Sequence, residues 1–408
     1  MSVPAAQETH VELHVGIDAT TWANDRGFGR FTRELVAALA ARRRAIRYTL
    51  LFDQPPTAHL PDGVGVICAS TRRSLNESAV GDGSRSLAYL WRMGQAARRA
   101  RFDVFFFPAV YSYFPILARV PCVICYHDAT AERLPDLLFP SRRNRLLWRV
   151  KTALARRQTA RAMTVSQTSA RDLREILGIP GDRIDIVTEA ADPIFCVLPD
   201  PNVGPRAKKR HGVPANAELL VYVGGLNRHK NVLGLLRAMP LVLAARPAVH
   251  LAIVGDTSGR GFWDNVPELM RFVAQQPLLA QHVHFTGRLE DAELVELLNA
   301  ASALVLPSLW EGFGLPAVEA MACGLPVLAS RRGSLPEVVA DAGLFFEPDS
   351  PQAIAGCVLE FLENPAAQAR LRRAALHRAG TFSWARAAEL AEESFRRCHA
   401  QEAARSAR

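Results

Sequence analysis

Short apolar runs alternate with helical stretches along almost the whole chain, and this alternation restricts the fold more than any other feature. VELHVGID at 11–18, FDVFFFP at 102–108 and CVICYH at 122–127 have the length and the β-branched or aromatic content of buried strands. FTRELVAALAARR at 31–43 has helical periodicity. Strands that alternate with helices favour parallel sheets covered by helices, so we predict an α/β fold.

A second series of strand and helix patterns begins at Glu218, after a polar stretch with several prolines at 192–217. A chain of 408 residues is too long for one ordinary domain, so we predict two domains with a boundary near Phe195. The predicted domains, 1–195 and 196–383, each have the size and pattern of one doubly wound, Rossmann-like unit. Two such domains would face each other across a cleft at the carboxyl ends of their strands, where folds of this kind bind ligands.

The composition fits a soluble globular protein, with 49% hydrophobic and 22% charged residues. No apolar run reaches the length of about 18 residues that a membrane span needs, and MSVPAAQETHVELHV at the start lacks the pattern of a secretory signal. The seven cysteines lack a framework spacing, which is typical of a reducing compartment, and we predict a cytoplasmic protein. Cys122 and Cys125 form a C-x-x-C within a predicted strand, where residues three apart point to opposite faces, so we predict no zinc or redox site there.

The formal net charge of +9 is compatible with nucleic acid, anionic lipid or phosphate-bearing ligands, but no nucleic-acid-binding module is recognisable. One basic stretch, Arg142–Arg161, has helical periodicity and combines arginines with leucines and a tryptophan. Two interpretations are open for it: a surface helix whose apolar stripe packs inward, or a helix that contacts a membrane surface.

Two carboxylates flank a glycine turn in SLWEGFGLPAVEAMACGLPVLAS at 308–330. After a predicted strand the chain makes this turn and enters a short helix, where Pro316 suits the first turn because its missing N–H costs nothing there. The free amides at the start of the helix form an anion site. Glu311 lies on the turn, and Glu319 lies about one turn into the helix.

A carboxylate beside such an anion site is suited to accept hydrogen bonds from hydroxyl groups of the bound ligand rather than to bind phosphate itself. A ligand with a central diphosphate and a hydroxyl-bearing ring at each end satisfies both requirements. We therefore predict a nucleotide-sugar site, against the alternative of an ordinary strand–turn–helix with solvated glutamates.

The same segment resembles the Glu–seven residues–Glu motif of the retaining nucleotide-sugar glycosyltransferases of family four, which have the GT-B fold. Other segments resemble further motifs of that family, in the family's order. They are VGIDATTWANDRGFGRFTRELVAAL at 15–39, YHDAT at 126–130, TVSQTSARDL at 164–173, IVTEAADPIF at 186–195, YVGGLNRHKN at 222–231, SLPEVVADAGLFFEP at 334–348 and FSWARAAE at 382–389. The resemblance implies a GT-B architecture of two Rossmann-like domains facing across a cleft, in which the C-terminal helix, about 384–408, joins the first domain.

The resemblance also implies how the second domain holds its donor. Glu319 would accept hydrogen bonds from the ribose hydroxyls, and Glu311 would contact hydroxyls of the transferred sugar. Backbone amides near Phe313, Gly314 and Leu315 would hold sugar and phosphate.

Lys230 would pair with the diphosphate as a compact positive charge. Many relatives carry an arginine in this loop at the position of Gly225. Arg228 is the nearest replacement, and a glycine amide is the alternative.

In the first domain, Gly27 and Gly29 form a G-x-G that follows the first strand and precedes a helix. This segment is a candidate to close over the diphosphate, and the alternative is a tight turn that needs glycine dihedrals. His127, at the end of a predicted strand, resembles the family histidine that lies near the sugar, and the alternative is a structural histidine.

We therefore predict a retaining hexosyltransferase that uses a UDP- or GDP-sugar and a glycan or lipid-linked saccharide acceptor, in the cytoplasm or at the inner face of the membrane. The segment at 334–343 resembles bacterial mannosyltransferases of polysaccharide assembly, so GDP-mannose is the first choice of donor. The resemblance implies catalysis without a metal, with His127, Glu311 and Lys230 as catalytic residues. The alternatives are a sugar-nucleotide epimerase or a sugar phosphorylase on the same fold, and a non-catalytic sugar-nucleotide-binding protein.

Overall fold

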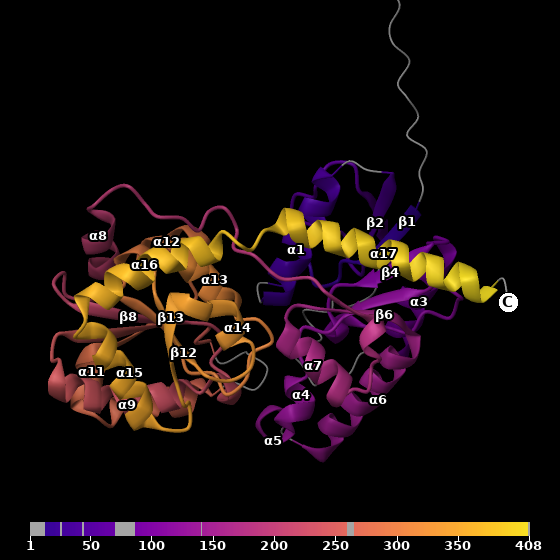
Figure 1. Ribbon diagram of the computed structural model, residues 1–408. Helices are drawn as coiled ribbons and strands as arrows, with labels where there is room; N and C mark the ends of the chain where they lie inside the picture. The colour runs from indigo at the N-terminus through magenta and orange to yellow at the C-terminus, as the bar shows by residue number, and fades with distance from the viewer. Residues whose placement is uncertain are drawn as a thin grey trace, which may run out of the picture.

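The computed structural model consists of two α/β lobes side by side, each built around its own parallel sheet (Figure 1). It describes residues 13–24, 27–42, 45–69, 86–139, 141–258 and 265–406. We call the lobe whose strands precede residue 187 the N-terminal lobe, and the lobe whose strands follow residue 217 the C-terminal lobe.

The sheet of the N-terminal lobe has seven strands in the order β3-β2-β1-β4-β5-β6-β7, and all neighbouring strands are parallel. The strands are β1 Leu13–Asp18, β2 Ile46–Phe52, β3 Gly65–Cys68, β4 Val104–Phe107, β5 Cys122–Cys125, β6 Thr159–Thr164 and β7 Ile184–Ile186. The direction of winding reverses between β1 and β4, and the carboxyl ends of these strands are the usual ligand position in such a sheet.

The sheet of the C-terminal lobe has six parallel strands in the order β10-β9-β8-β11-β12-β13. The strands are β8 Glu218–Val223, β9 Val249–Val254, β10 Val283–Gly287, β11 Ala303–Leu306, β12 Val327–Ser330 and β13 Gly343–Phe346. Winding reverses between β8 and β11, so the loops that follow these two strands lie beside each other.

Helices cover the faces of both sheets, as parallel strands require because they are buried on both sides. Those of the N-terminal lobe are α1 Gly27–Ala41, α3 Leu87–Arg99, α4 Thr130–Arg133, α5 Pro135–Leu138, α6 Arg142–Gln158 and α7 Gln167–Glu175. Those of the C-terminal lobe are α8 Val203–Arg210, α9 Val232–Ala245, α10 Val266–Ala274, α11 Pro277–His282, α12 Asp291–Ala300, α13 Leu315–Ala322, α14 Leu335–Val339, α15 Pro351–Leu362 and α16 Pro365–Ala379.

The last helix, α17 Trp384–Ser406, returns from the C-terminal lobe and lies along the N-terminal lobe (Figure 1). The Tyr48 hydroxyl donates to Glu392 of this helix at 3.3 Å, and Arg42 forms ion pairs with both Glu389 and Glu392. Residues at the two ends of the sequence therefore stabilise one lobe together.

The predicted fold class, two Rossmann-like α/β units, is confirmed, and each sheet has one more strand than its sequence pattern indicated. β7 was missed because it is only three residues long, too short to show a strand pattern, and β13 was missed because it begins with a glycine and only its last residue is buried. β1 begins at Leu13, and the first two residues of the predicted strand lie outside the described residues. The predicted boundary at Phe195 lies between β7 and β8.

The C-x-x-C of β5 is divided between two cores. Cys122 packs with the aromatic cluster on one face of the sheet, and Cys125 packs in the main core on the other face. Both are free thiols, and burial raises the pKa of Cys122 well above its ordinary value. As predicted, the two thiols cannot act as a pair.

Three histidines stack at the edge of the C-terminal sheet. The His250 ring lies 4.5 Å from the His282 ring and 5.2 Å from the His284 ring, and His250 Nδ1 is 2.9 Å from His284 Nε2. Burial lowers the pKa of His250 to about 4, and the neighbouring His282 and His284 add to that shift. The folded protein therefore favours the uncharged form of His250.

Mild acid is expected to destabilise the C-terminal lobe through this stack. The pKa of His250 is depressed on folding, so its contribution to stability is complete above pH 6.5 and is lost as the pH falls towards 4. Between pH 7 and pH 5 the free energy of unfolding is expected to fall by on the order of 2 kcal/mol from this residue. Thermal unfolding of the wild type and of His250→Gln across this range would check it, and equal pH dependence in the two proteins would contradict it.

Candidate functional site

Glu311 lies on the turn between β11 and α13 and is held by neighbouring side chains. Gly314 ends the turn with a left-handed φ of +95°, which glycine adopts without strain, and Pro316 follows in the first turn of α13. Ser308 Oγ donates to Glu311 Oε1 at 2.7 Å, and Lys230 Nζ donates to both carboxylate oxygens at 2.7 Å. The turn thus forms as predicted, with its carboxylate already paired.

Lys230 reaches Glu311 because β8 and β11 are neighbours in the sheet. Lys230 ends the short 3-10 turn Arg228–Lys230 after β8, and the next side chain, Asn231, donates to Pro307 O at 3.1 Å. Burial acts to raise the pKa of Glu311, but the Lys230 ammonium lowers it below its ordinary value. Glu311 is therefore ionised at neutral pH, and the two side chains, 13% and 22% exposed, form an ion pair.

Glu319, on the first turns of α13, is only 5% exposed and has a different partner. Its Oε1 accepts a hydrogen bond from Arg30 Nη1 at 2.9 Å, and the other terminal nitrogen of Arg30 donates to Asp291. Burial raises the pKa of Glu319 to about 7, although Arg30 opposes this shift. The two predicted carboxylates therefore differ, since Glu311 is a stable anion and Glu319 titrates near neutral pH.

The segment between the two carboxylates is fixed by its carbonyl groups. Ser334 Oγ donates to Glu311 O at 3.1 Å and to Phe313 O at 2.8 Å. The Phe313 ring is buried and packs edge-on against Phe382 at 5.5 Å. With its carbonyls bonded and its side chain in the core, this segment offers backbone amides at Gly314 and Leu315, at the start of α13.

His127 follows β5 and has both ring nitrogens engaged within the N-terminal lobe. Its Nδ1 lies 3.2 Å from Glu189 Oε1, and its Nε2 lies 2.9 Å from Pro108 O. Burial acts to lower the pKa of the ring, but contacts with Cys125 and Glu189 raise it well above its ordinary value. His127 is therefore a cation that donates from both nitrogens, and it has no free nitrogen to accept a proton.

The remaining predicted residues lie apart from this group. Gly27 and Gly29 form the first turn of α1, so the expectation of a glycine loop before the helix is corrected. A Cβ on Gly29 would lie 1.8 Å from Asn24 O, and this close approach requires glycine. The Gly225 carbonyl accepts a bond from the hydroxyl of a buried tyrosine at 2.5 Å, and Arg228 is 62% exposed and lies near Glu268.

The loop that carries Glu311 is bound to the N-terminal lobe. The Gly312 carbonyl accepts hydrogen bonds from Ser166 Oγ at 2.6 Å and Ser169 Oγ at 3.0 Å. The guanidinium of Arg133 lies 3.9 Å above the ring of Trp310, close enough for a cation–π interaction. The site is therefore assembled from both lobes, with the lobes in contact.

A second inter-lobe contact joins α14 to α7. Glu337 accepts bonds from the backbone N–H of Gln167 at 2.8 Å and of Thr168 at 3.0 Å, at the start of α7. The carboxylate thus satisfies free amides at a helix N-terminus, where negative charge is favoured.

Sequence analysis did not assign a role to Arg30, Glu189 or Glu337. Each lies inside a segment that was singled out, at 15–39, 186–195 or 334–348, but its partner lies far away in the sequence. The position of Arg30 directly after Gly29 was the available signal for the first of them. None of the three partners follows from sequence spacing, because each pairing depends on how strands or lobes are placed.

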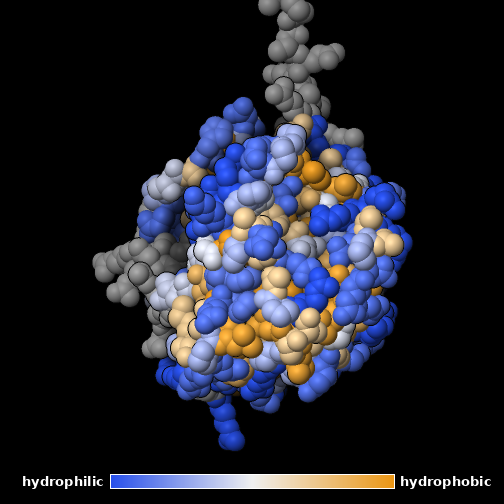
Figure 2. Space-filling view, turned by 90° about the vertical axis from the view of Figure 1, so that its left-hand side faces the viewer, coloured by the Kyte–Doolittle hydropathy of each residue, from blue (hydrophilic) through white to orange (hydrophobic). Residues whose placement is uncertain are grey.

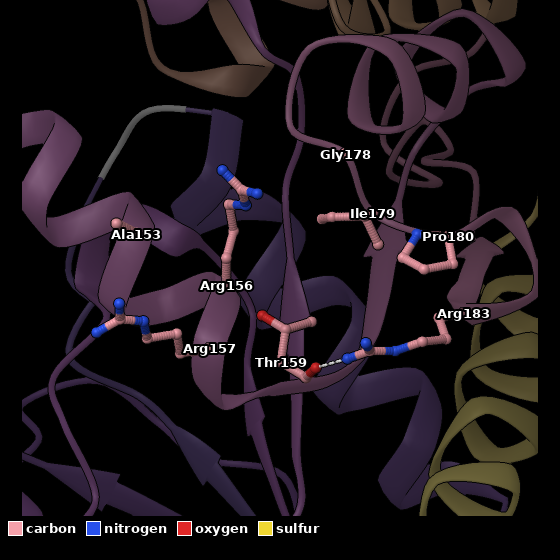
Figure 3. A pocket seen from close by; sticks show the side chains of 8 residues that line it. All are labelled: Ala153, Arg156, Arg157, Thr159, Gly178, Ile179, Pro180 and Arg183. Carbon is pink, nitrogen blue, oxygen red and sulfur yellow. Dashed lines mark hydrogen bonds between the residues drawn. The ribbon is translucent and has the colours of Figure 1, made fainter.

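A cavity of about 390 Å³ lies elsewhere, between the end of α6 and the segment 178–183 that precedes β7 (Figure 3). Arg183 donates to the Thr159 carbonyl there, and the side chains of Arg156 and Arg157 point in different directions. Thr159 is at the amino end of β6, whereas His127 follows the carboxyl end of β5. The cavity and His127 therefore lie at opposite ends of the strands. No predicted site residue lines it.

The described residues contain no group of three or more histidine, cysteine, aspartate or glutamate side chains that could hold a metal ion. They also contain no helix both long and apolar enough to cross a membrane.

Comparisons with known proteins identify similar glycosyltransferases. The family model "Glycosyl transferases group 1" matches residues 204–378, and "Glycosyltransferase Family 4" matches residues 26–193. A D-inositol 3-phosphate glycosyltransferase of Nocardiopsis dassonvillei is 33% identical over 60% of this chain and 58% of its own length. An O-antigen chain mannosyltransferase B of Escherichia coli is 33% identical over 54% of this chain and 56% of its own length. The chain thus spans little more than half the length of these relatives.

A solved structure shows the same fold over nearly the whole chain. Anabaena HepE in complex with UDP-glucose has a TM-score of 0.69, at 21% identity, over 93% of this chain and 99% of its own. The two family models lie one on each lobe, in the order that the motifs predicted. The chain therefore belongs to the group 1 glycosyl transferases of family four, whose members have the GT-B fold.

Proposed function

We propose that the chain transfers a hexosyl unit from a nucleoside diphosphate sugar to a hydroxyl of a glycan or lipid-linked saccharide, with retention of configuration. The observation that carries this proposal is the partly buried ion pair between Lys230, after β8, and Glu311, on the turn before α13. A cation, a set of helix amides and two unlike carboxylates suit a ligand that has a diphosphate and hydroxyl-bearing rings.

In this proposal Lys230 exchanges its partner during the reaction. In the free protein its ammonium neutralises Glu311. When a donor binds, the ammonium and the amides of Gly314 and Leu315 stabilise the diphosphate, on which negative charge develops as the glycosidic bond breaks. Glu311 then accepts hydrogen bonds from the transferred sugar. Proton transfer from the acceptor is assigned to the departing phosphate, because both nitrogens of His127 are already donors.

A relative and a structural neighbour point to two different donors. A mannosyl donor agrees with the name of the O-antigen mannosyltransferase, and a UDP-sugar agrees with the ligand of HepE. A thermal-shift screen with UDP, GDP, UDP-glucose, UDP-N-acetylglucosamine and GDP-mannose tests both, since a ligand that binds the folded state raises its melting temperature. Stabilisation by neither nucleoside diphosphate would contradict the proposal.

Four further measurements test the activity and its mechanism, and the first two separate the rival activities. Incubation with donor alone would reveal an epimerase, and dependence on inorganic phosphate would reveal a phosphorylase. Proton NMR of the first product tests retention of configuration. Turnover in EDTA tests the expectation that Lys230 and the helix amides act without a divalent metal.

Contact with a membrane surface is the second part of this proposal. Leu146, Leu147, Val150 and Leu154 of α6 are between 40% and 59% exposed, whereas the buried residues of this helix are Thr152 and Ala155. The apolar stripe therefore faces outward, which favours the membrane interpretation over inward packing. On the outer face of the C-terminal lobe, by contrast, hydrophilic residues interrupt the hydrophobic areas (Figure 2). Arginines along α6 would contact anionic head groups while the stripe enters the interface.

Replacing Val150 with glutamate is expected to weaken binding to vesicles that contain phosphatidylglycerol by about tenfold or more, because apolar burial is lost and a negative charge is added. Leu278→Glu is the matched control, since Leu278 is 49% exposed on α11 and Val150 is 50% exposed. Co-sedimentation with vesicles measures the effect. Equal binding of the two variants would contradict the assignment of α6.

A further inference from the structure

Arg30 reaches from the N-terminal lobe into the donor side of the site. It lies on the first turn of α1, and its side chain is 18% exposed. One terminal nitrogen donates to Glu319 Oε1 at 2.9 Å, and the other donates to Asp291 at the start of α12. The guanidinium also lies 5.3 Å from the ring centre of Phe195, in the segment that joins the lobes. Four elements therefore fix the direction of this side chain.

The contact leaves part of Glu319 available. Among the described residues, Arg30 donates to Oε1 and no hydrogen bond is made to Oε2. An ionised carboxylate has about four acceptor positions on its two oxygens, so two ribose hydroxyls could be accommodated beside the guanidinium.

Glu319 needs Arg30 in order to be ionised and accept hydrogen bonds from ribose, because the other charges around it favour its protonated form. Burial raises the pKa of this carboxyl, and Asp291, Glu189 and Asp192 raise it further. Arg30 is the cation that opposes these effects. Without it, the carboxyl would be largely protonated at neutral pH and would be a poorer acceptor.

We propose that Arg30 is a positioning residue for the donor, which holds Glu319 Oε1 from the opposite lobe and thereby presents Oε2 to the ribose hydroxyls. The inference rests on the proposed function, in which Glu319 binds ribose. It also gives domain closure a role in donor recognition, since the acceptor group on one lobe is oriented by a cation on the other.

Calorimetric titration with UDP and with GDP, and with the 2′,3′-dideoxy analogue of whichever binds, tests this role. Arg30→Gln is expected to weaken binding of the ribonucleotide by about tenfold, the loss of one hydrogen bond to a charged group. Binding of the dideoxy analogue should change by less than about twofold, because it lacks the hydroxyls that Glu319 would accept. Arg30→Lys, which keeps the charge, should restore part of the affinity.

Arg42→Gln is the matched control. Arg42 directly follows α1, is 15% exposed and pairs with two carboxylates, Glu389 and Glu392, of α17. This variant is expected to lose stability but to bind the ribonucleotide as the wild type does. Circular dichroism confirms the folding of each variant.

Two results would overturn the inference. Arg30→Gln could bind the ribonucleotide with wild-type affinity. It could lose affinity for both ligands equally, which would mean that Arg30 acts on the phosphates or on the fold. Failure of the wild type to bind UDP and GDP would instead contradict the proposed function itself.

Discussion

Replacing Lys230 with alanine is expected to lower the transfer rate at least tenfold, equivalent to about 1.4 kcal/mol or more of lost transition-state stabilisation. The ammonium contacts Glu311, beside the proposed position of the leaving diphosphate, and an arginine is lacking at Gly225, where many family members have one. Arg228 is largely exposed and lies towards Glu268, so it is a poor substitute in this arrangement. Steady-state kinetics with the donor identified by the thermal-shift screen measures the loss.

The same substitution should also destabilise the protein, because it leaves Glu311 buried without its cation. The free energy of unfolding is expected to fall by about 2 to 3 kcal/mol, because a partly buried carboxylate loses its ion-pair partner. Burial would then raise the pKa of Glu311 above its ordinary value, so the loss should be greater at pH 8 than at pH 5.

The double variant Lys230→Ala with Glu311→Gln separates the two effects. Removing the unpaired charge should restore most of the stability, while nucleoside diphosphate binding stays weaker than in Glu311→Gln alone, because the ammonium is missing. If the double variant is stable and binds nucleoside diphosphate as tightly as Glu311→Gln alone, Lys230 does not contact the diphosphate and its proposed role in catalysis is wrong.

The fold followed from the sequence because buried parallel strands are nearly continuous apolar runs. β4, with the sequence Val-Phe-Phe-Phe, is fully buried and could not be mistaken for a loop. β7 has the sequence Ile-Asp-Ile, and the charged Asp185 in its middle interrupts the apolar run by which a buried strand is recognised. In the structure this aspartate pairs with the buried Arg161 of β6.

The site could be predicted only as separate pieces. Lys230 and Glu311 were each identified from a motif, but their pairing depends on β8 and β11 being neighbours in the sheet. In the sequence, the end of β8 at Val223 and the start of β11 at Ala303 are 80 positions apart. Periodicity likewise showed that α6 has an apolar stripe but not which way the stripe faces. The pairing of Lys230 with Glu311 and the direction of the α6 stripe depend on strand order and on packing, and local sequence patterns do not predict either of these.

Glu311→Gln is expected to leave nucleoside diphosphate binding intact, or to tighten it a few-fold, while lowering the transfer rate by about a hundredfold. The amide keeps the shape of the side chain but no longer competes as an anion for Lys230, which is then free for the diphosphate. The lost activity reflects a weaker acceptor for the hydroxyls of the transferred sugar. Calorimetry with UDP or GDP and single-turnover kinetics with the full donor measure the two effects.

Glu319→Gln, on the helix α13 that follows this turn, is expected to give the opposite pattern. Its binding of the bare nucleoside diphosphate should fall by about tenfold or more, since a charged acceptor for the ribose is worth about 1.5 to 3 kcal/mol. Arg30 keeps Asp291 as a partner in this variant, so a folded protein is expected. The two variants should differ because the two carboxylates differ in partner and in pKa. Glu311 is ionised beside Lys230, whereas Glu319, beside Arg30, has a pKa of about 7. If both variants lost nucleoside diphosphate affinity equally, the two carboxylates would not serve opposite ends of one donor.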